Sequence, residues 1–253
     1  MIIEFYIFSY IHIKNFKMSV LKNIGKYTNG EYDDNKKVDH ITSYNIPNNI
    51  TKLEDYCFFE CYNLSSITIP DSIKYIGTEC FESCEKLSLI TIPNSVQTLG
   101  DHCFFCCYNL NSVIIGNSVS ILGCSCFEGC ENLSSITIPD LVKSLGDYCF
   151  NCCYNLRTVT IGKSVTSLGD CCFKYCYNLS SITIPDSVTS LGNSCFEGCD
   201  NLSSITIPDS VTSLGDGCFD CCSNLKTIYT NNPLIKPGKY DIPLNTMIIP
   251  IKK

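Results

Sequence analysis

The sequence contains no tryptophan, only three histidines, and a single arginine, Arg157, in 253 residues. It has 18 basic against 25 acidic residues and therefore lacks the clustered positive charge that neutralises a phosphate backbone, which argues against nucleic acid as a partner. Three histidines offer few candidates for acid–base catalysis. The sequence also lacks a glycine-rich phosphate loop, an HExxH motif and a nucleophile elbow. We therefore expect no enzyme, no cofactor and no small-molecule substrate.

Long hydrophobic runs are also scarce. The first segment, residues 1–17, is apolar but interrupted by Glu4, and it has neither a basic leading region nor a small-residue cleavage pattern. It is too short and too interrupted for a transmembrane helix. Because Met18 offers a second start, we interpret residues 1–17 as a weak leader or as not native to the protein. We expect residues 1–40 as a whole to form an N-terminal segment and cap.

Cysteine, in contrast, is abundant, with 21 residues, and most of it follows a strict period. A unit of 23 residues repeats eight times from Ile41 to Asn224 without an insertion. Each unit has a leucine, a Cys-Phe pair and a second cysteine four positions after the first; the pairs begin at Cys57, Cys80, Cys103, Cys126, Cys149, Cys172, Cys195 and Cys218. One such unit cannot enclose a core, so stacked units must bury equivalent positions as columns.

Within the unit, the sequence "LSSITIPDSVTSLG" predicts a strand and two turns. Ile205 and Ile207 alternate with Ser204 and Thr206, which is the period-2 pattern of a strand. Pro208 lacks an N–H group and should end the strand pairing. We interpret the glycine after "VTSL" as a left-handed bend, and the Cys-Phe-x-x-Cys segment as one short helical turn. Parallel strands then stack about 4.8 Å apart.

The complete motif, "LxxIxIPxSVxxLGxxCFxxCxN", resembles the leucine-rich repeat of BspA-type surface antigens, in which Ala-Phe usually stands where this chain has Cys-Phe. The resemblance covers about residues 41–230. It implies a curved, right-handed leucine-rich-repeat solenoid, with a parallel β-sheet on the concave face and turns and short helical turns on the other. It also implies a protein-interaction role of the surface-antigen and cell-adhesion type, with a host, matrix or cellular protein as partner.

The domain organisation follows from the repeat. We expect residues 41–230 to form the solenoid, with eight units and a last strand. Residues 231–253 lose the period and contain several prolines, and we expect them to form a C-terminal cap because a solenoid exposes apolar surface at its ends.

The cysteines admit three interpretations. Cys103/Cys106, Cys149/Cys152 and Cys218/Cys221 have the spacing of zinc ligands. These pairs lie two or three units apart, however, so about 10–15 Å separates them and one tetrahedral site is excluded. Disulfides between stacked cysteines fit poorly because their Cβ vectors are parallel. We favour cysteine as a small apolar residue that fills the core, and we expect no metal site.

The candidate binding residues lie on outward columns. The column before each leucine contains Tyr62, Glu85, Tyr108, Glu131, Tyr154 and Tyr177, and a nearby column contains Phe59 and Phe105. Aromatic residues outside a core are typical of protein contacts. The alternative is that these rings only cover the edge of the next unit. The strand face presents mainly Ser and Thr, and this hydroxyl surface keeps a glycan open as a partner.

Two locations remain open at this stage. The family resemblance favours the cell surface, whereas the weak leader and the many unpaired thiols favour the cytoplasm. In the second case the chain would be an intracellular leucine-rich-repeat scaffold or regulatory protein. Formal glycosylation motifs arise from the repeat itself, and they therefore do not decide between the two; they begin at Asn49, Asn63, Asn132, Asn178 and Asn201.

Overall fold

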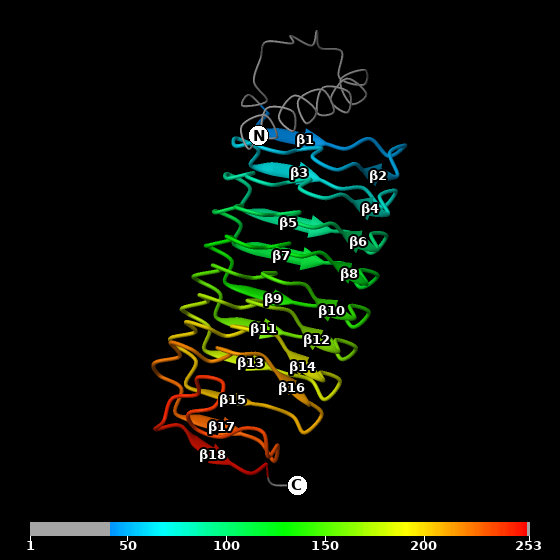
Figure 1. Cartoon of the computed structure of the whole chain (residues 1–253). Helices are drawn as coiled ribbons and strands as arrows, with labels where there is room; N and C mark the ends of the chain where they lie inside the picture. Colours follow the sequence, from blue (N-terminus) through cyan, green and yellow to red (C-terminus); the bar gives the residue numbers. More distant parts are fainter. Residues whose placement is uncertain (1–40, 252–253) are drawn as a thin grey trace, which may run out of the picture.

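A computed structural model describes residues 41–251, and these form a solenoid of about nine coils with parallel strands (Figure 1). One strand from each coil lies in a first column: β1 (Ser43–Asn45), β3 (Ser66–Thr68), β5 (Leu89–Ile92), β7 (Ser112–Ile115), β9 (Ser135–Thr137), β11 (Thr158–Thr160), β13 (Ser181–Thr183), β15 (Ser204–Thr206), β17 (Thr227–Tyr229) and β18 (Met247–Ile249). Strands of two residues form a second column: β2 (Lys52–Leu53), β4 (Tyr75–Ile76), β6 (Thr98–Leu99), β8 (Ile121–Leu122), β10 (Ser144–Leu145), β12 (Ser167–Leu168), β14 (Ser190–Leu191) and β16 (Ser213–Leu214).

The strands pair in the register that the repeat predicts. In β11 and β13, Thr158 lies opposite Ser181 and Thr160 opposite Thr183, so each residue pairs with its equivalent 23 positions along the chain. The second column behaves in the same way, with Leu145 of β10 opposite Leu168 of β12. The predicted parallel solenoid is therefore confirmed.

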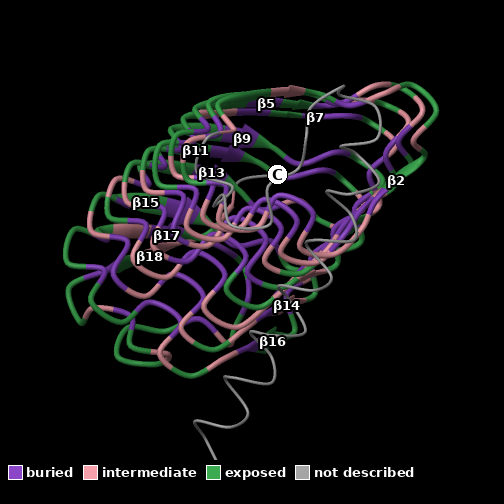
Figure 2. Cartoon of the chain, turned by 90° about the horizontal axis from the view of Figure 1, so that it is seen from above, coloured by how far each residue is buried: buried purple, intermediate pink, exposed green. Residues whose placement is uncertain are grey.

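A column of eight phenylalanine rings occupies the centre of the coil. All eight are fully buried: Phe58, Phe81, Phe104, Phe127, Phe150, Phe173, Phe196 and Phe219. Successive rings are stacked with centroids 5.2–5.6 Å apart and interplanar angles of 1–9°. Seen from above, buried residues line the inside of the coil and exposed residues its outside (Figure 2). Burying one such ring stabilises the fold by about 1.5–3 kcal/mol.

The Cys-Phe-x-x-Cys segment does not form the short helical turn that we expected. No helix occurs among residues 41–251, and this segment forms successive hydrogen-bonded turns instead. In one coil, His102 and Cys106 have φ angles of 53° and 55°, and such left-handed residues cannot continue a right-handed helix. Their N–H groups donate to the next coil, to the carbonyls of Cys124 and Glu128 at 2.8 and 2.9 Å.

The glycine that closes "VTSLG" and its equivalents has a different role from the predicted left-handed bend. The φ angle of Gly100 is not left-handed, and a Cβ atom there would lie 2.4 Å from the backbone N of Thr78. Gly77, Gly123 and Gly192 meet the preceding coil in the same way. Glycine is therefore required by the close approach of two coils.

Residues 230–251 continue the coil beyond the repeat. Met247 of β18 pairs with Thr227 of β17, so this last coil is three residues shorter than the 23-residue unit. Ile235 and Ile242 are buried in it, and the Phe219 N–H donates to the Tyr240 carbonyl at 3.2 Å. The predicted N-terminal cap, residues 1–40, lies outside the described residues. Among residues 41–251, no helix is long and apolar enough to cross a membrane.

Candidate functional site

The repeated cysteines belong to the core. All 21 cysteines are free thiols, and the 16 that occupy the two repeated positions are buried. The second cysteine of a unit donates its S–H to a phenylalanine carbonyl of the preceding coil; Cys107, for example, lies 3.1 Å from the Phe81 oxygen, and seven such bonds span 3.0–3.3 Å. Burial raises the pKa of the Cys107 and Cys130 thiols far above the ordinary value. These thiols are consequently poor nucleophiles.

The five additional cysteines lie nearer the surface. Cys106, Cys152, Cys171 and Cys221 have left-handed backbone at the corners of the coil, and Cys124 is exposed. In each pair with zinc-like spacing, the first cysteine is buried in the core while the second lies outside it. Across residues 41–251, no three metal-binding side chains are grouped to hold an ion.

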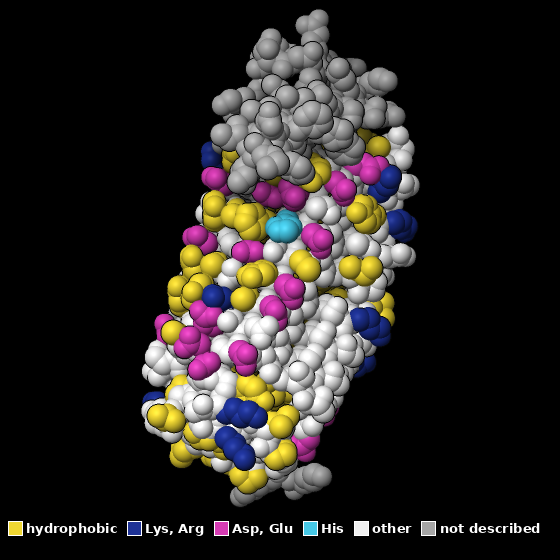
Figure 3. Space-filling model, in the orientation of Figure 1, with side chains coloured by type: hydrophobic (Ala, Val, Ile, Leu, Met, Phe, Trp, Pro, Cys, Tyr) yellow, Lys and Arg dark blue, Asp and Glu magenta, His cyan; other side chains and the backbone are white. Residues whose placement is uncertain are grey.

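The eight predicted binding residues lie outside the core, on the turns. We call them the aromatic-acidic strip: Tyr62, Phe59, Glu85, Tyr108, Phe105, Glu131, Tyr154 and Tyr177. Tyr62, Tyr108 and Tyr177 are 36%, 37% and 41% exposed, and the other five are half-buried. The repeat brings them together because they occupy equivalent positions on successive coils. Acidic and hydrophobic side chains are interspersed along one face of the molecule (Figure 3).

Neighbouring groups hold several tyrosine rings of the strip. A hydrogen bond to the Cys106 thiol raises the pKa of Tyr108 to about 12, and a bond to the Cys152 thiol does the same for Tyr154. The Tyr154 and Tyr177 rings are stacked, with centroids 5.3 Å apart. Part of the aromatic surface is therefore used within the chain, as the covering interpretation predicts, while three tyrosines keep a third or more of their surface exposed.

Next to the strip lies a carboxyl pair that the sequence analysis missed. Glu82 occupies the position that Phe59 and Phe105 occupy in the coils on either side. Burial, together with the negative charge of Glu79, raises the pKa of Glu82 to about 8. The two carboxyls share a hydrogen bond, and burial also raises the pKa of Glu79. The signal that reveals the pair is a glutamate at both positions, since the other seven units have no acidic residue at the position equivalent to Glu79.

A ladder of asparagine side chains, which the sequence analysis also missed, lies in the column one position after Tyr108, Glu131, Tyr154 and Tyr177. Asn132, Asn155, Asn178 and Asn201 each donate Nδ2–H to the Oδ1 atom of the preceding asparagine, at 3.0–3.4 Å. Lys86 stands in this column between Asn63 and Asn109 and interrupts it. In three of the glycosylation motifs, those of Asn132, Asn178 and Asn201, the Nδ2 group of the asparagine therefore donates a hydrogen bond within the ladder. Reading the column after each Tyr or Glu would have revealed it.

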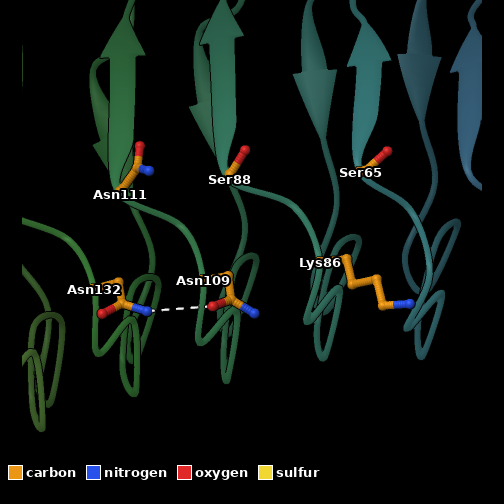
Figure 4. A pocket seen from close by; sticks show the side chains of 6 residues that line it. All are labelled: Ser65, Lys86, Ser88, Asn109, Asn111 and Asn132. Atoms are coloured by element: carbon orange, nitrogen blue, oxygen red, sulfur yellow. Dashed lines mark hydrogen bonds between the residues drawn. The ribbon is translucent and has the colours of Figure 1, made fainter.

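A pocket of about 550 Å³ lies at this interruption (Figure 4). Its lining comes from the ladder column and from the residues just before the strands: Ser65, Lys86, Ser88, Asn109, Asn111 and Asn132. All six are polar and exposed.

Comparison with known families agrees with this geometry. The BspA type Leucine rich repeat region matches in six copies, over residues 35–157 and 143–242. The chain belongs to the BspA-type leucine-rich repeat family. This confirms the resemblance stated from the motif. Leucine-rich repeat families of this kind are typically non-catalytic. In a comparison with curated proteins, nothing matches the chain.

Two solved structures are similar to this BspA-type chain. A leucine-rich repeat protein from Bacteroides ovatus is 29% identical, with a TM-score of 0.63 over 84% of this chain. The T. pallidum leucine-rich repeat protein is 27% identical, with a TM-score of 0.61, and the match covers 64% of this chain and 78% of that one. This chain spans 63% of the Bacteroides protein.

Proposed function

We propose that this BspA-type chain is a non-catalytic protein-interaction module that binds a protein partner through the aromatic-acidic strip. The observation that carries the proposal is the placement of tyrosines outside the core at fixed intervals along the coil. Tyr62 and Tyr108 lie two coils apart, or about 10 Å. Tyrosine is enriched among the residues that contribute most to protein binding.

The strip is also preorganised. The stacking of the Tyr154 ring on the Tyr177 ring, with centroids 5.3 Å apart, restricts both side chains before binding. Less conformational entropy is then lost in a complex. Glu85 and Glu131 alternate with the tyrosines, and within residues 41–251 neither forms an ion pair. We therefore expect a partner surface with basic and apolar residues at the strip.

The finer role in this proposal is that of a surface antigen in cell adhesion, with a host, matrix or cellular protein as the ligand. Its support is the BspA-type repeat over most of the described chain. An intracellular scaffold is the second candidate, and the free thiols favour it because a reducing compartment preserves thiols.

Replacing four tyrosines together tests the proposal: Tyr62→Ser, Tyr108→Ser, Tyr154→Ser and Tyr177→Ser. Proteins captured from host-surface and cytosolic extracts are identified, and the affinity of the purified partner is measured for both chains. We expect a loss of at least about tenfold, because contact aromatics are removed. The melting temperature should change little, since these rings lie outside the core.

The matched control places four substitutions on the strand face: Thr91→Ser, Thr137→Ser, Thr183→Ser and Thr206→Ser. This variant should bind the partner as the unmodified chain does. Equal binding by the tyrosine variant and the unmodified chain would refute the role of the strip.

A further inference from the structure

The pocket beside the ladder combines two departures from the repeat on neighbouring coils. Lys86 replaces the ladder asparagine, and Asn111 replaces the serine that precedes the strand in several other units, such as Ser88 and Ser134. Lys86 extends along the coil axis away from Asn109 (Figure 4). Lysine offers no acceptor for the side-chain amide of Asn109, which donates to the Glu85 carbonyl at 2.7 Å. The ladder therefore begins at Asn109, whose Oδ1 atom accepts from Asn132.

Three side chains of the pocket keep unused hydrogen-bonding groups. Within residues 41–251, Lys86 Nζ, Ser88 Oγ and the side-chain amide of Asn111 have neither an ion pair nor a hydrogen bond. Serine hydroxyls at the position equivalent to Ser88 in other coils do form hydrogen bonds. Ser134 and Ser180 donate to the carbonyls of Asn111 and Arg157, at 3.5 and 3.2 Å. These unpaired groups thus line the pocket that the two departures create, with Ser88 and Asn111 in one row and Lys86 in the other (Figure 4).

We propose that this pocket binds the carboxylate-bearing sugar of an acidic glycan. In this arrangement the Lys86 ammonium pairs with the carboxylate of one sugar, while Ser88 and Asn111, in the other row of lining residues, bond hydroxyl groups along the glycan. All six lining residues are polar, so the pocket offers no apolar side chain for the anchor residues that dominate peptide recognition. Its volume of about 550 Å³ lies within the range of small-molecule sites.

The open form of the pocket predicts weak binding of one sugar and stronger binding of a polymer. All six lining residues are exposed, so a single ring would remain partly in solvent. Acidic sugars repeated along a glycan raise the effective concentration at the site. The pocket does not depend on the aromatic-acidic strip, and the two proposals can fail separately.

Calorimetric titration of the full chain tests the pocket with tetragalacturonate and with a sialic acid tetramer. The comparison ligands are fully methyl-esterified tetragalacturonate, which lacks the charge, and a tetraglutamate peptide, which carries carboxylates without sugar. The key variant is Lys86→Asn, which restores the ladder residue and should fold normally. Lys226→Asn is the control, because it removes one exposed lysine from another coil.

We expect at least one acidic tetramer to bind, with a loss of about tenfold in affinity for Lys86→Asn and none for Lys226→Asn. Binding should also weaken as salt is added. Failure of both acidic tetramers to bind would overturn the proposal, as would equal losses in the two lysine variants. If the methyl ester binds as tightly as tetragalacturonate, the pocket does not recognise the carboxylate and the proposal is wrong. If tetraglutamate binds as tightly as the acidic tetramers or more tightly, the pocket is a peptide site instead.

Discussion

At the residue scale, the thiol in the core is more than a filler of volume. An alanine would occupy a similar place, but a cysteine also donates to a carbonyl of the preceding coil, as Cys107 does to Phe81. That carbonyl already accepts the Cys84 N–H at 3.1 Å, so the thiol adds a second bond. Each such bond joins two coils inside the apolar core, where hydrogen bonds are strong.

Glu82 provides a residue-scale prediction on pH. Its pKa is about 8 in the folded chain, because of burial and the charge of Glu79, and about 4.3 in an unfolded one. Between these values the folded state holds the extra proton, so stability falls as pH rises from about 4.5 to about 8. Glu82→Gln keeps a donor for Glu79 and removes the charge. We expect it to raise the free energy of unfolding at pH 8 by about 1 kcal/mol, a value reduced for solvent screening of this half-buried group.

Thermal melts across pH 4.5–8 measure this effect. The control is Glu128→Gln, which removes a carboxylate from the same column and keeps the Oε1 acceptor of Asn151. If Glu82→Gln melts at pH 8 like the unmodified chain, the carboxyl pair does not destabilise the folded state.

At the scale of the element, the unit is one coil, and its most constrained point is the approach of one coil to the next. Gly100 meets Thr78 and Gly77 there, and Gly123 meets Asp101 and Gly100 in the same way. The corner residues are constrained differently, by left-handed φ angles that accept Glu60, Ser83 or Cys106 as well as glycine. At the close-approach positions, contact with backbone atoms limits which residue fits. At the corner positions, only the strain of a left-handed φ angle limits the choice.

Comparing one substitution from each class tests this distinction. Gly100→Ala places a methyl group against backbone atoms and should destabilise the chain by about 3 kcal/mol or more. Gly129→Asn, at a corner with a φ angle of 71°, should cost about 1 kcal/mol or less, since Asn tolerates this conformation. Urea unfolding measures both values. Similar losses for the two variants would contradict the close-approach explanation.

At the scale of the whole molecule, the columns make stability a sum over neighbouring coils. Every buried thiol therefore reports on the opening of its own coil. The five thiols outside the core give a contrast within the same chain: Cys106, Cys124, Cys152, Cys171 and Cys221.

Pulsed labelling with a maleimide, followed by mass spectrometry, tests this organisation. We expect those five thiols to react in the native state and the 16 core thiols to react only when coils open, because burial raises their pKa and excludes the reagent. Core thiols of the last unit, such as Cys218, should open earlier than those in the middle, such as Cys126. Labelling of core and surface thiols at one rate would show that no continuous buried column exists.

The sequence predicted much of the architecture but less of the candidate site. The 23-residue period identified the inward columns of Phe and Cys, and it placed Tyr62 and Tyr108 outside the core. It did not reveal the Tyr108–Cys106 contact or the raised pKa of Glu82, because these depend on burial and on how the left-handed turns place side chains two or three residues apart. The ladder and Lys86 were readable from the sequence, but only once the outward columns had been compared residue by residue.

The sequence alone determined the parallel stacking, the 23-residue register and the buried column, because a strict repeat admits one arrangement that buries every apolar position. Only the tertiary structure decided how the coil closes. It showed turns with left-handed corners where we expected a helical turn, and glycines selected by contact with the preceding coil. These features depend on which backbone atoms of adjacent coils meet at each turn, and local sequence patterns do not encode those contacts.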